Sequence, residues 1–264
     1  MSVYTQALFC DTATQFYLLH AFSTDPTQGF TGSFLLAQKR RLAEESLQTL
    51  KHTIMTQLVP SYHTYQTLAM LGNPVKAIET LLAQEYFDLV VVRATGLGRT
   101  TLFGSVATDI IRFDITNVLV VPGWSPVRAI KRLVLAIDYK SVNNAESFSF
   151  LTELARRKEA RLLLLNIEVT RQTDRLASDL SRQYVLRAFK NLQKQTFSVH
   201  DEDIQQGINA YLDRYPVDLF VMLPHHKRVF CVLLNKSETH HLAYHPRVTL
   251  MTLYDAPTPG EKNS

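Results

Sequence analysis

The stretch that decides the fold is residues 88–106, DLVVVRATGLGRTTLFGSV. Its first part, Asp88 to Val92, is a short apolar run typical of a strand that is buried on both faces. Glycines follow, and a helix is predicted to begin near Ser105. Glycines let a ligand approach the backbone, and a helix N-terminus offers free N–H donors to an anion. The stretch therefore has the arrangement of a phosphate cradle, although spacing alone slightly favours a tight turn between strand and helix with Ser105 as N-cap.

Similar apolar runs recur along the chain between segments with helical periodicity. This alternation predicts an α/β protein with right-handed crossovers and a mainly parallel sheet. The other predicted strands are 16–22, 118–121, 133–137, 162–167, 219–222 and 248–253. The other predicted helices are 34–58, 74–84, 144–159, 173–192 and 203–215, and Asn73 is expected to cap the second of these.

An internal repeat divides the sequence into two halves. The run LLHAF at 18–22 matches LLNIE at 164–168, and DLVV at 88–91 matches DLFV at 218–221. The prolines, glycine and serine of 122–126 mark a linker. The predicted domains are therefore 1–125 and 126–264.

The first half of the repeat starts late. The second half opens with a strand at 132–137 and a helix, whereas the first half has only about fifteen residues before the strand at 16–22. We therefore expect about 25 residues to be missing before Met1, through a misplaced start codon or a truncated chain, since domains have a typical size. Loss of that strand would expose apolar sheet edges.

The order of motifs in 88–122 resembles the C-terminal half of a universal stress protein domain. The apolar run at 16–21 is similar to that family's second strand, so the repeat resembles a tandem universal stress protein. The resemblance implies two mainly parallel five-stranded sheets with helices on both faces, the first lacking its first strand. It also implies that the two domains pair through their last strands, at 117–121 and 248–253, about a pseudo-two-fold axis.

The same resemblance implies an ATP site at the carboxyl ends of the strands in the first half. The family's acidic residue at the end of the first strand is missing here, and the gaps between the glycines are shorter than in the family. The implied nucleotide-binding residues are Gly104, Ser105 and Val106 around the phosphate, Gly96 and Gly98 along the triphosphate, and Ala21 beside the adenine.

The second half departs from the family in the opposite way. Asp138 follows its first strand, Ile167 is at the adenine-contact position, and Ser237 is where Ser105 is in the first half. The stretch 223–230, however, contains no glycine, and long side chains there would crowd a phosphate. We expect this second, degenerate site not to bind ATP in the family's manner.

Composition excludes several other classes of protein. A net charge of +4 over 264 residues is weak and spread along the chain, so it gives no argument for nucleic acid. No apolar run approaches the roughly 20 residues of a membrane span. No secretory signal is present at the start, which makes the cytoplasm the expected compartment. Cys10 and Cys231 have no CxxC partner and are expected to be packed free thiols.

Clusters of basic residues and histidines have ordinary explanations. The basic run 39–41 is expected on a solvated helix face, paired with glutamates one turn later. The basic run 156–158 is expected at a helix C-terminus, where cations are favoured. The histidines at 225, 226, 240, 241 and 245 are expected at a surface. A transition-metal site or a pH response is the alternative for that cluster, and no metal is predicted for the chain.

The function expected from the sequence is binding of an ATP-like nucleotide in a stress response, without significant turnover. The alternative is a protein-interaction scaffold with decayed sites, and a slow ATPase is the weaker third hypothesis because no general base is evident. The expected partners are an adenine nucleotide and an unidentified protein, with neither nucleic acid nor membrane. The expected assembly is an intramolecular pseudo-dimer, with a homodimer as a further alternative.

Overall fold

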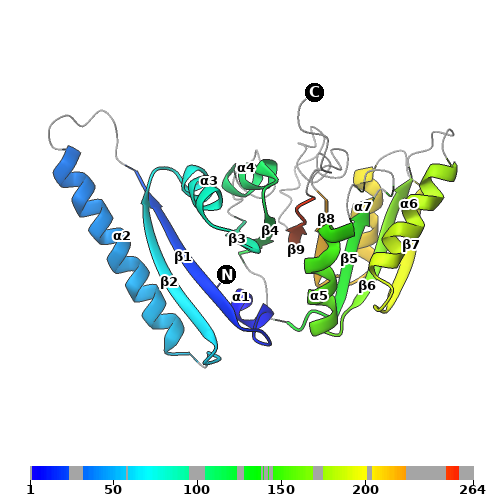
Figure 1. Ribbon diagram of the computed structural model, residues 1–264, viewed down its shortest axis with the longest axis horizontal. Helices are drawn as coiled ribbons and strands as arrows, with labels where there is room; N and C mark the ends of the chain where they lie inside the picture. Colours follow the sequence, from blue (N-terminus) through cyan, green and yellow to red (C-terminus); the bar gives the residue numbers. More distant parts are fainter. Residues whose placement is uncertain are drawn as a thin grey trace. The chain divides into compact units, whose positions relative to one another are not determined.

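A computed structural model of the chain describes most of its residues (Figure 1). The described residues are 2–23, 32–57, 59–94, 105–123, 128–137, 139, 142, 145–168, 175–200, 204–223 and 248–255. They form two compact units, Ser2–Tyr86 and Phe87–Ser264. None of the helices among these residues is long and apolar enough to cross a lipid bilayer.

The unit Ser2–Tyr86 is built on two parallel strands. Its elements are α1 (Ser2–Leu8), β1 (Thr14–Phe22), α2 (Gly32–Met55), β2 (His63–Leu71) and α3 (Pro74–Gln84). Strand β1 pairs with β2 from Thr14↔His63 to Phe22↔Leu71. In Figure 1 the long helix α2 lies along this pair, and its buried side chains Ala43, Leu47 and Ile54 follow the helical period of a packed face.

Helix α3 begins as the sequence predicts. The Asn73 side chain accepts a hydrogen bond from the Lys76 N–H at 2.8 Å, and Pro74 occupies the first helical turn. Proline is favoured there because its missing N–H would have no intrahelical partner in any case. Cap and proline together fix the start of the helix.

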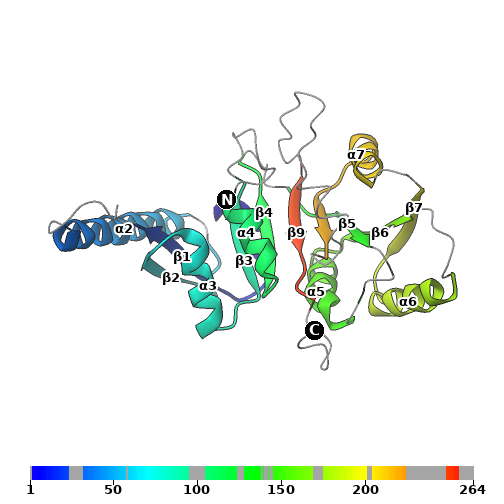
Figure 2. The same ribbon diagram turned by 90° about the horizontal axis from the view of Figure 1, so that it is seen from above.

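The unit Phe87–Ser264 contains a seven-stranded sheet. Its order is β3-β4-β9-β8-β5-β6-β7, and all neighbours are parallel except β4 and β9, which lie side by side in Figure 2. The elements are β3 (Leu89–Arg93), α4 (Ser105–Phe113), β4 (Asn117–Val121), β5 (Arg132–Ile137), η2 (Ala145–Phe148), α5 (Ser149–Arg157), β6 (Arg161–Glu168), α6 (Arg175–Ala188), β7 (Lys194–His200), α7 (Ile204–Arg214), β8 (Leu219–Met222) and β9 (Thr249–Thr252).

Strands β4 and β9 pair antiparallel through matching positions of the two halves. Leu119 pairs with Val91 of β3, Met251 pairs with Val221 of β8, and Leu119 and Met251 pair with each other. Because DLVV at 88–91 matches DLFV at 218–221, Leu119 and Met251 occupy the same place in the two halves of the sheet. An antiparallel pairing of equivalent residues is the geometry of an isologous interface.

The side chain of Asn117 ties the two sides of this seam together. Its amide donates to the Asp88 carbonyl at 2.8 Å and accepts from the Tyr254 N–H at 2.9 Å. Both central residues, Leu119 and Met251, are fully buried. The predicted pairing of 117–121 with 248–253 is therefore confirmed.

Other sequence predictions are corrected by the sheets. The chain is α/β with mostly parallel strands, as expected, but the sheets have two and seven strands instead of five each. The antiparallel pairing of β4 with β9 extends one sheet across both halves of the sequence. Of the two cysteines, Cys10 is exposed, so its prediction as a packed thiol is wrong, and Cys231 lies outside the described residues.

The start of β5 is held by a half-buried carboxylate. Asp218 accepts the backbone N–H groups of Lys131 and Arg132 at 3.0 and 2.9 Å, and its other oxygen accepts the Arg132 guanidinium at 3.1 Å. Burial alone would raise the pKa of Asp218, but these donors outweigh it and the pKa lies below its ordinary value of 3.8. Asp88, its counterpart on β3, is exposed, and no described residue donates to its carboxylate.

We predict that Asp218→Asn lowers the free energy of unfolding by about 1–2 kcal/mol at neutral pH, because charged hydrogen bonds are lost at a partly screened site. A carboxyl with a lowered pKa stabilises the fold above its unfolded pKa, and this contribution is lost as pH falls through the folded value. The difference from wild type should therefore shrink below about pH 3.8. Urea denaturation across pH measures it.

Asp88→Asn is the matched control, since it removes the equivalent carboxylate where no described donor is present. Its effect on unfolding should stay within about 0.5 kcal/mol. Equal losses for the two variants would contradict the role assigned to Asp218.

Candidate functional site

The candidate site lies at the carboxyl edge of β3 and β4. These strands are parallel and α4 connects them, so the helix begins at the edge where β3 ends. Helix α4 starts at Ser105, as the sequence predicts, and Val106 in its first turn is half-buried. The first N–H groups of a helix have no intrahelical partners and can bind an anion. Gly96, Gly98 and Gly104 lie outside the described residues.

Arg93 is a charged residue at this edge that the sequence analysis did not single out. It ends β3, it is exposed, and its guanidinium lies against Gly123, just beyond the end of β4. A Cβ at Gly123 would come within 2.9 Å of the Arg93 Nη2, so the glycine leaves room for this side chain. The signal in the sequence was a lone arginine between an apolar strand and a glycine-rich stretch.

Ala21 belongs to the other compact unit. It lies in β1, pairs with Met70 of β2, and is half-buried. Two residues further on, the Ser23 carbonyl accepts a hydrogen bond from the Lys39 Nζ of α2 at 2.7 Å. The end of β1 therefore has its own cation, from the basic run that the sequence predicts on a solvated face.

The matching edge of β8 and β9 is filled by side chains. Leu223 follows β8 where Arg93 is in the first half, and it is fully buried. Asp255 follows β9 where Gly123 is in the first half; it is also buried and accepts a hydrogen bond from the Ser147 hydroxyl of η2. An apolar side chain and a hydrogen-bonded carboxylate thus stand at the positions that the exposed Arg93 and Gly123 occupy in the first half.

Of the three residues predicted for the degenerate second site, the structure describes only the backbone of one, Ile167. Asp138 and Ser237 lie outside the described residues. Ile167 lies in β6 and pairs with Val199 of β7, and its side chain is not described.

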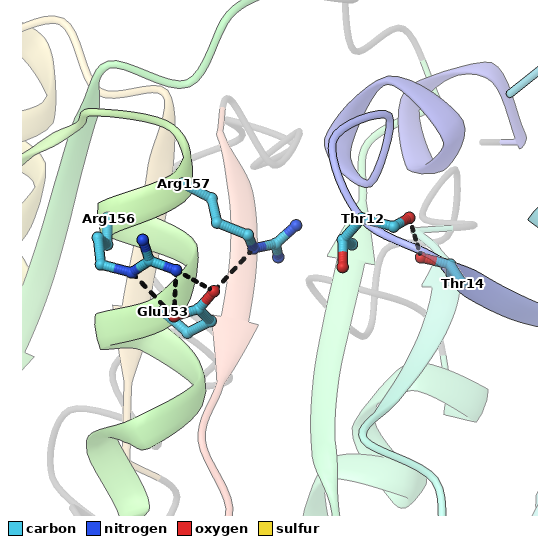
Figure 3. Close-up of polar contacts among 5 residues, drawn as sticks. All are labelled: Thr12, Thr14, Glu153, Arg156 and Arg157. Atoms are coloured by element: carbon cyan, nitrogen blue, oxygen red, sulfur yellow. Dashed lines mark hydrogen bonds and ion pairs between the residues drawn. The ribbon is translucent and has the colours of Figure 1, made fainter. Parts of the chain in front are cut away.

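The arginines of the basic runs are paired within their own helices. Figure 3 shows Glu153 between Arg156 and Arg157 near the end of α5, with the Arg156 Nη2 at 2.8 Å and the Arg157 Nε at 3.6 Å from its carboxylate. These contacts raise the pKa of Arg156, first through the hydrogen bond to Glu153 and then through its charge. Arg41 pairs with Glu45 at 2.7 Å in the same way on α2. Both expectations for these runs are confirmed.

Metal chemistry finds no support in the described part of the chain. No group of three or more histidine, cysteine, aspartate or glutamate side chains gathers there as a metal would need. The five clustered histidines of 225–245 lie outside the described residues.

Comparison with solved protein structures identifies the fold. No protein-family model and no curated protein matches the chain. Among solved structures, a universal stress protein from Archaeoglobus fulgidus DSM 4304 matches with a TM-score of 0.68. The match covers 95% of this chain and 90% of that one, at 14% identity. The chain has the universal stress protein fold.

Two Pseudomonas aeruginosa structures share this universal stress protein fold. One, from strain UCBPP-PA14, carries the same family name in its description; the TM-score is 0.56 at 12% identity, over 90% of this chain and 94% of that one. The other, a protein of unknown function from strain PAO1, has a TM-score of 0.55 at 12% identity, over 90% of this chain and 92% of that one. At such identities the likeness concerns the fold alone.

The open and filled edges can be distinguished by exchanging their residues. Arg93→Leu should change the free energy of unfolding by less than about 0.5 kcal/mol, because the arginine is exposed. Leu223→Arg should cost at least about 3 kcal/mol, because it puts an unpaired charge into a fully buried position. Chemical denaturation measures both values, and similar values for the two variants would mean that the edges do not differ.

Proposed function

We propose that the chain is a tandem universal stress protein that binds an adenine nucleotide at the carboxyl edge of β3 and β4. The observation that carries the proposal is the exposed Arg93 guanidinium, lying over Gly123 at the edge where α4 begins. Phosphate oxygens would accept hydrogen bonds from this guanidinium and from the N-terminal N–H groups of the helix. In this proposal Gly96, Gly98 and Gly104 let the phosphates approach the backbone. Ala21, which belongs to the other compact unit, stays the adenine contact implied by the family resemblance.

The tandem organisation has two supports in strand register. The first is the antiparallel pairing of Leu119 with Met251. The second is that β1–β2 and β6–β7 share a register: Leu18 pairs with Thr67, and its counterpart Leu164 pairs with Thr196. A glutamine precedes the threonine in both partner strands. We assign the two domains to 1–125 and 126–264, forming an intramolecular pseudo-dimer in the cytoplasm.

We assign nucleotide binding to the first domain alone. In the second domain the buried Leu223 and the Asp255–Ser147 hydrogen bond fill the corresponding edge. A phosphate there would have to displace buried side chains and leave a carboxylate beside its own negative charge. Asp138, Ile167 and Ser237 would then be remnants of a site that has lost its ligand.

We also propose that the bound nucleotide is not turned over at a significant rate. Arg93, the charged residue described at the edge, cannot take a proton from water because a guanidinium stays protonated. It can hold a phosphate in place without activating a nucleophile. Binding without turnover would make the nucleotide a signal that stabilises one state of the protein.

A protein-interaction scaffold is the second candidate function. Large apolar side chains that are exposed to solvent favour this function: Phe34 of α2 is 77% exposed and Tyr86 is 86% exposed. Under this hypothesis the nucleotide site has decayed in both domains, and exposed aromatic side chains contact a partner protein.

Titration calorimetry with ATP on the full chain tests the first proposal. We predict measurable binding, and Gly104→Lys should abolish it because a long side chain would fill the phosphate path. The matched control is Lys236→Gly, which makes the reverse change at the corresponding position of the second domain and should leave the affinity unchanged. Absence of heat from a folded protein at high micromolar ATP would reject nucleotide binding and favour the scaffold.

Arg93→Ala tests the residue that carries the proposal. We predict an affinity for ATP about tenfold lower, because a charge-assisted hydrogen bond to phosphate is lost. Since the folded protein should keep its stability, circular dichroism serves as the control. Unchanged ATP affinity in this variant would remove Arg93 from the site.

A further inference from the structure

Strand β3 is an edge strand of the seven-stranded sheet, whereas its counterpart β8 lies in the interior of that sheet. Figure 2 shows β3 outermost in the seven-stranded sheet, with β4 as its neighbour. Strand β8 has β9 on one side and β5 on the other. One side of β3 therefore has no strand among the described residues, and that side corresponds to the one on which β8 holds β5.

Burial along the two strands reflects this difference. Leu219, Phe220 and Val221 of β8 are at most 3% exposed. The matching residues of β3, Leu89, Val90 and Val91, are all half-buried. A similar apolar stretch is thus fully covered in one half of the repeat and only partly covered in the other.

The open side of β3 also carries backbone groups that pair with no described strand. The N–H of Ala94 donates to the Val121 carbonyl of β4 at 2.9 Å. Since the hydrogen-bonding direction alternates along a strand, Val92 and Val90 also face β4, while Val91 and Leu89 face the open side. Within β3 only its last residue, Arg93, is charged, and there is no proline, so little protects this edge from pairing with another strand.

A carboxylate marks the start of the open edge. On β8, Asp218 binds the first backbone N–H groups of β5 and the guanidinium of Arg132. Asp88 occupies the same position before β3, but it is exposed and no described residue donates to its carboxylate. The edge therefore combines an apolar strand with an acceptor suited to a basic residue at the start of an incoming strand.

We propose that the open edge of β3 binds a parallel β-strand from another polypeptide, with a basic first residue followed by about five apolar residues. Its basic side chain and first N–H groups would bind the Asp88 carboxylate, and its backbone would pair with Leu89 and Val91. The sequence of β5, Arg132–Ile137, is an example of this chemistry within the chain itself.

Fluorescence anisotropy with a labelled peptide tests the proposal on the full chain. The peptide carries residues 131–138, KRLVLAID, followed by a soluble polar tail. We expect saturable binding with a dissociation constant in the micromolar range. A peptide with glutamate in place of its arginine should bind about tenfold more weakly, because it repels Asp88. A scrambled peptide of the same composition should not bind.

Variants of the protein locate the peptide on β3. Asp88→Asn should weaken binding about tenfold, and Asp88→Arg should reverse the preference between the arginine and glutamate peptides. Val91→Pro should abolish binding because it removes a donor from the open side and spares the side that faces β4. Asp109→Asn, which removes a surface carboxylate of α4, is the matched control and should leave binding unchanged.

Three results would overturn the proposal. The first is no saturable binding to a chain that is folded by circular dichroism. The second is peptide binding that is insensitive to both Asp88 variants, which would place the peptide elsewhere. The third is a dimer in sedimentation that the peptide does not dissociate, which would mean that a second copy of the chain covers the edge.

Discussion

The antiparallel pairing of β4 with β9 is the interaction on which the larger unit depends. It joins β3 and β4 to the five strands of the second half, and without it the sheet would end at β9. Leu119 and Met251 face each other at its centre, fully buried, and each contributes roughly 1.5–3 kcal/mol by leaving water. Asn117 adds hydrogen bonds to Asp88 and Tyr254. One short seam thus joins strands from both sequence repeats in a single sheet.

Equivalent strands of the two halves have different surroundings. In the second half the buried side chains of Leu223 and Asp255 fill the carboxyl edge of β8 and β9. Strand β5 pairs with the side of β8 that faces away from β9. In the first half Arg93 lies exposed over Gly123, and β3 keeps one open side.

Sequence predicted seven of the nine described strands and missed β2 and β7. Continuous apolar runs such as 133–137 identified the covered strands, and the family resemblance implied the seam between 117–121 and 248–253. Strands β2 and β7 were missed because their residues alternate, as in His63-Thr64-Tyr65-Gln66, or are largely polar, as at the start of β7. Arg93 was missed because only the fold brings it against Gly123, thirty residues later. Gly96, Gly98, Gly104, Asp138 and Ser237 stay predictions from the sequence alone.

The measurement that tests the central claim most directly is the pattern of cross-strand nuclear Overhauser effects between β4 and β9 in the isotopically labelled chain. The account predicts backbone contacts for the pairs Val118–Thr252, Leu119–Met251 and Val120–Leu250, in antiparallel order about Leu119. A parallel order, a register shifted by a residue, or no contact between these segments would contradict it, because the two halves would then not share one sheet.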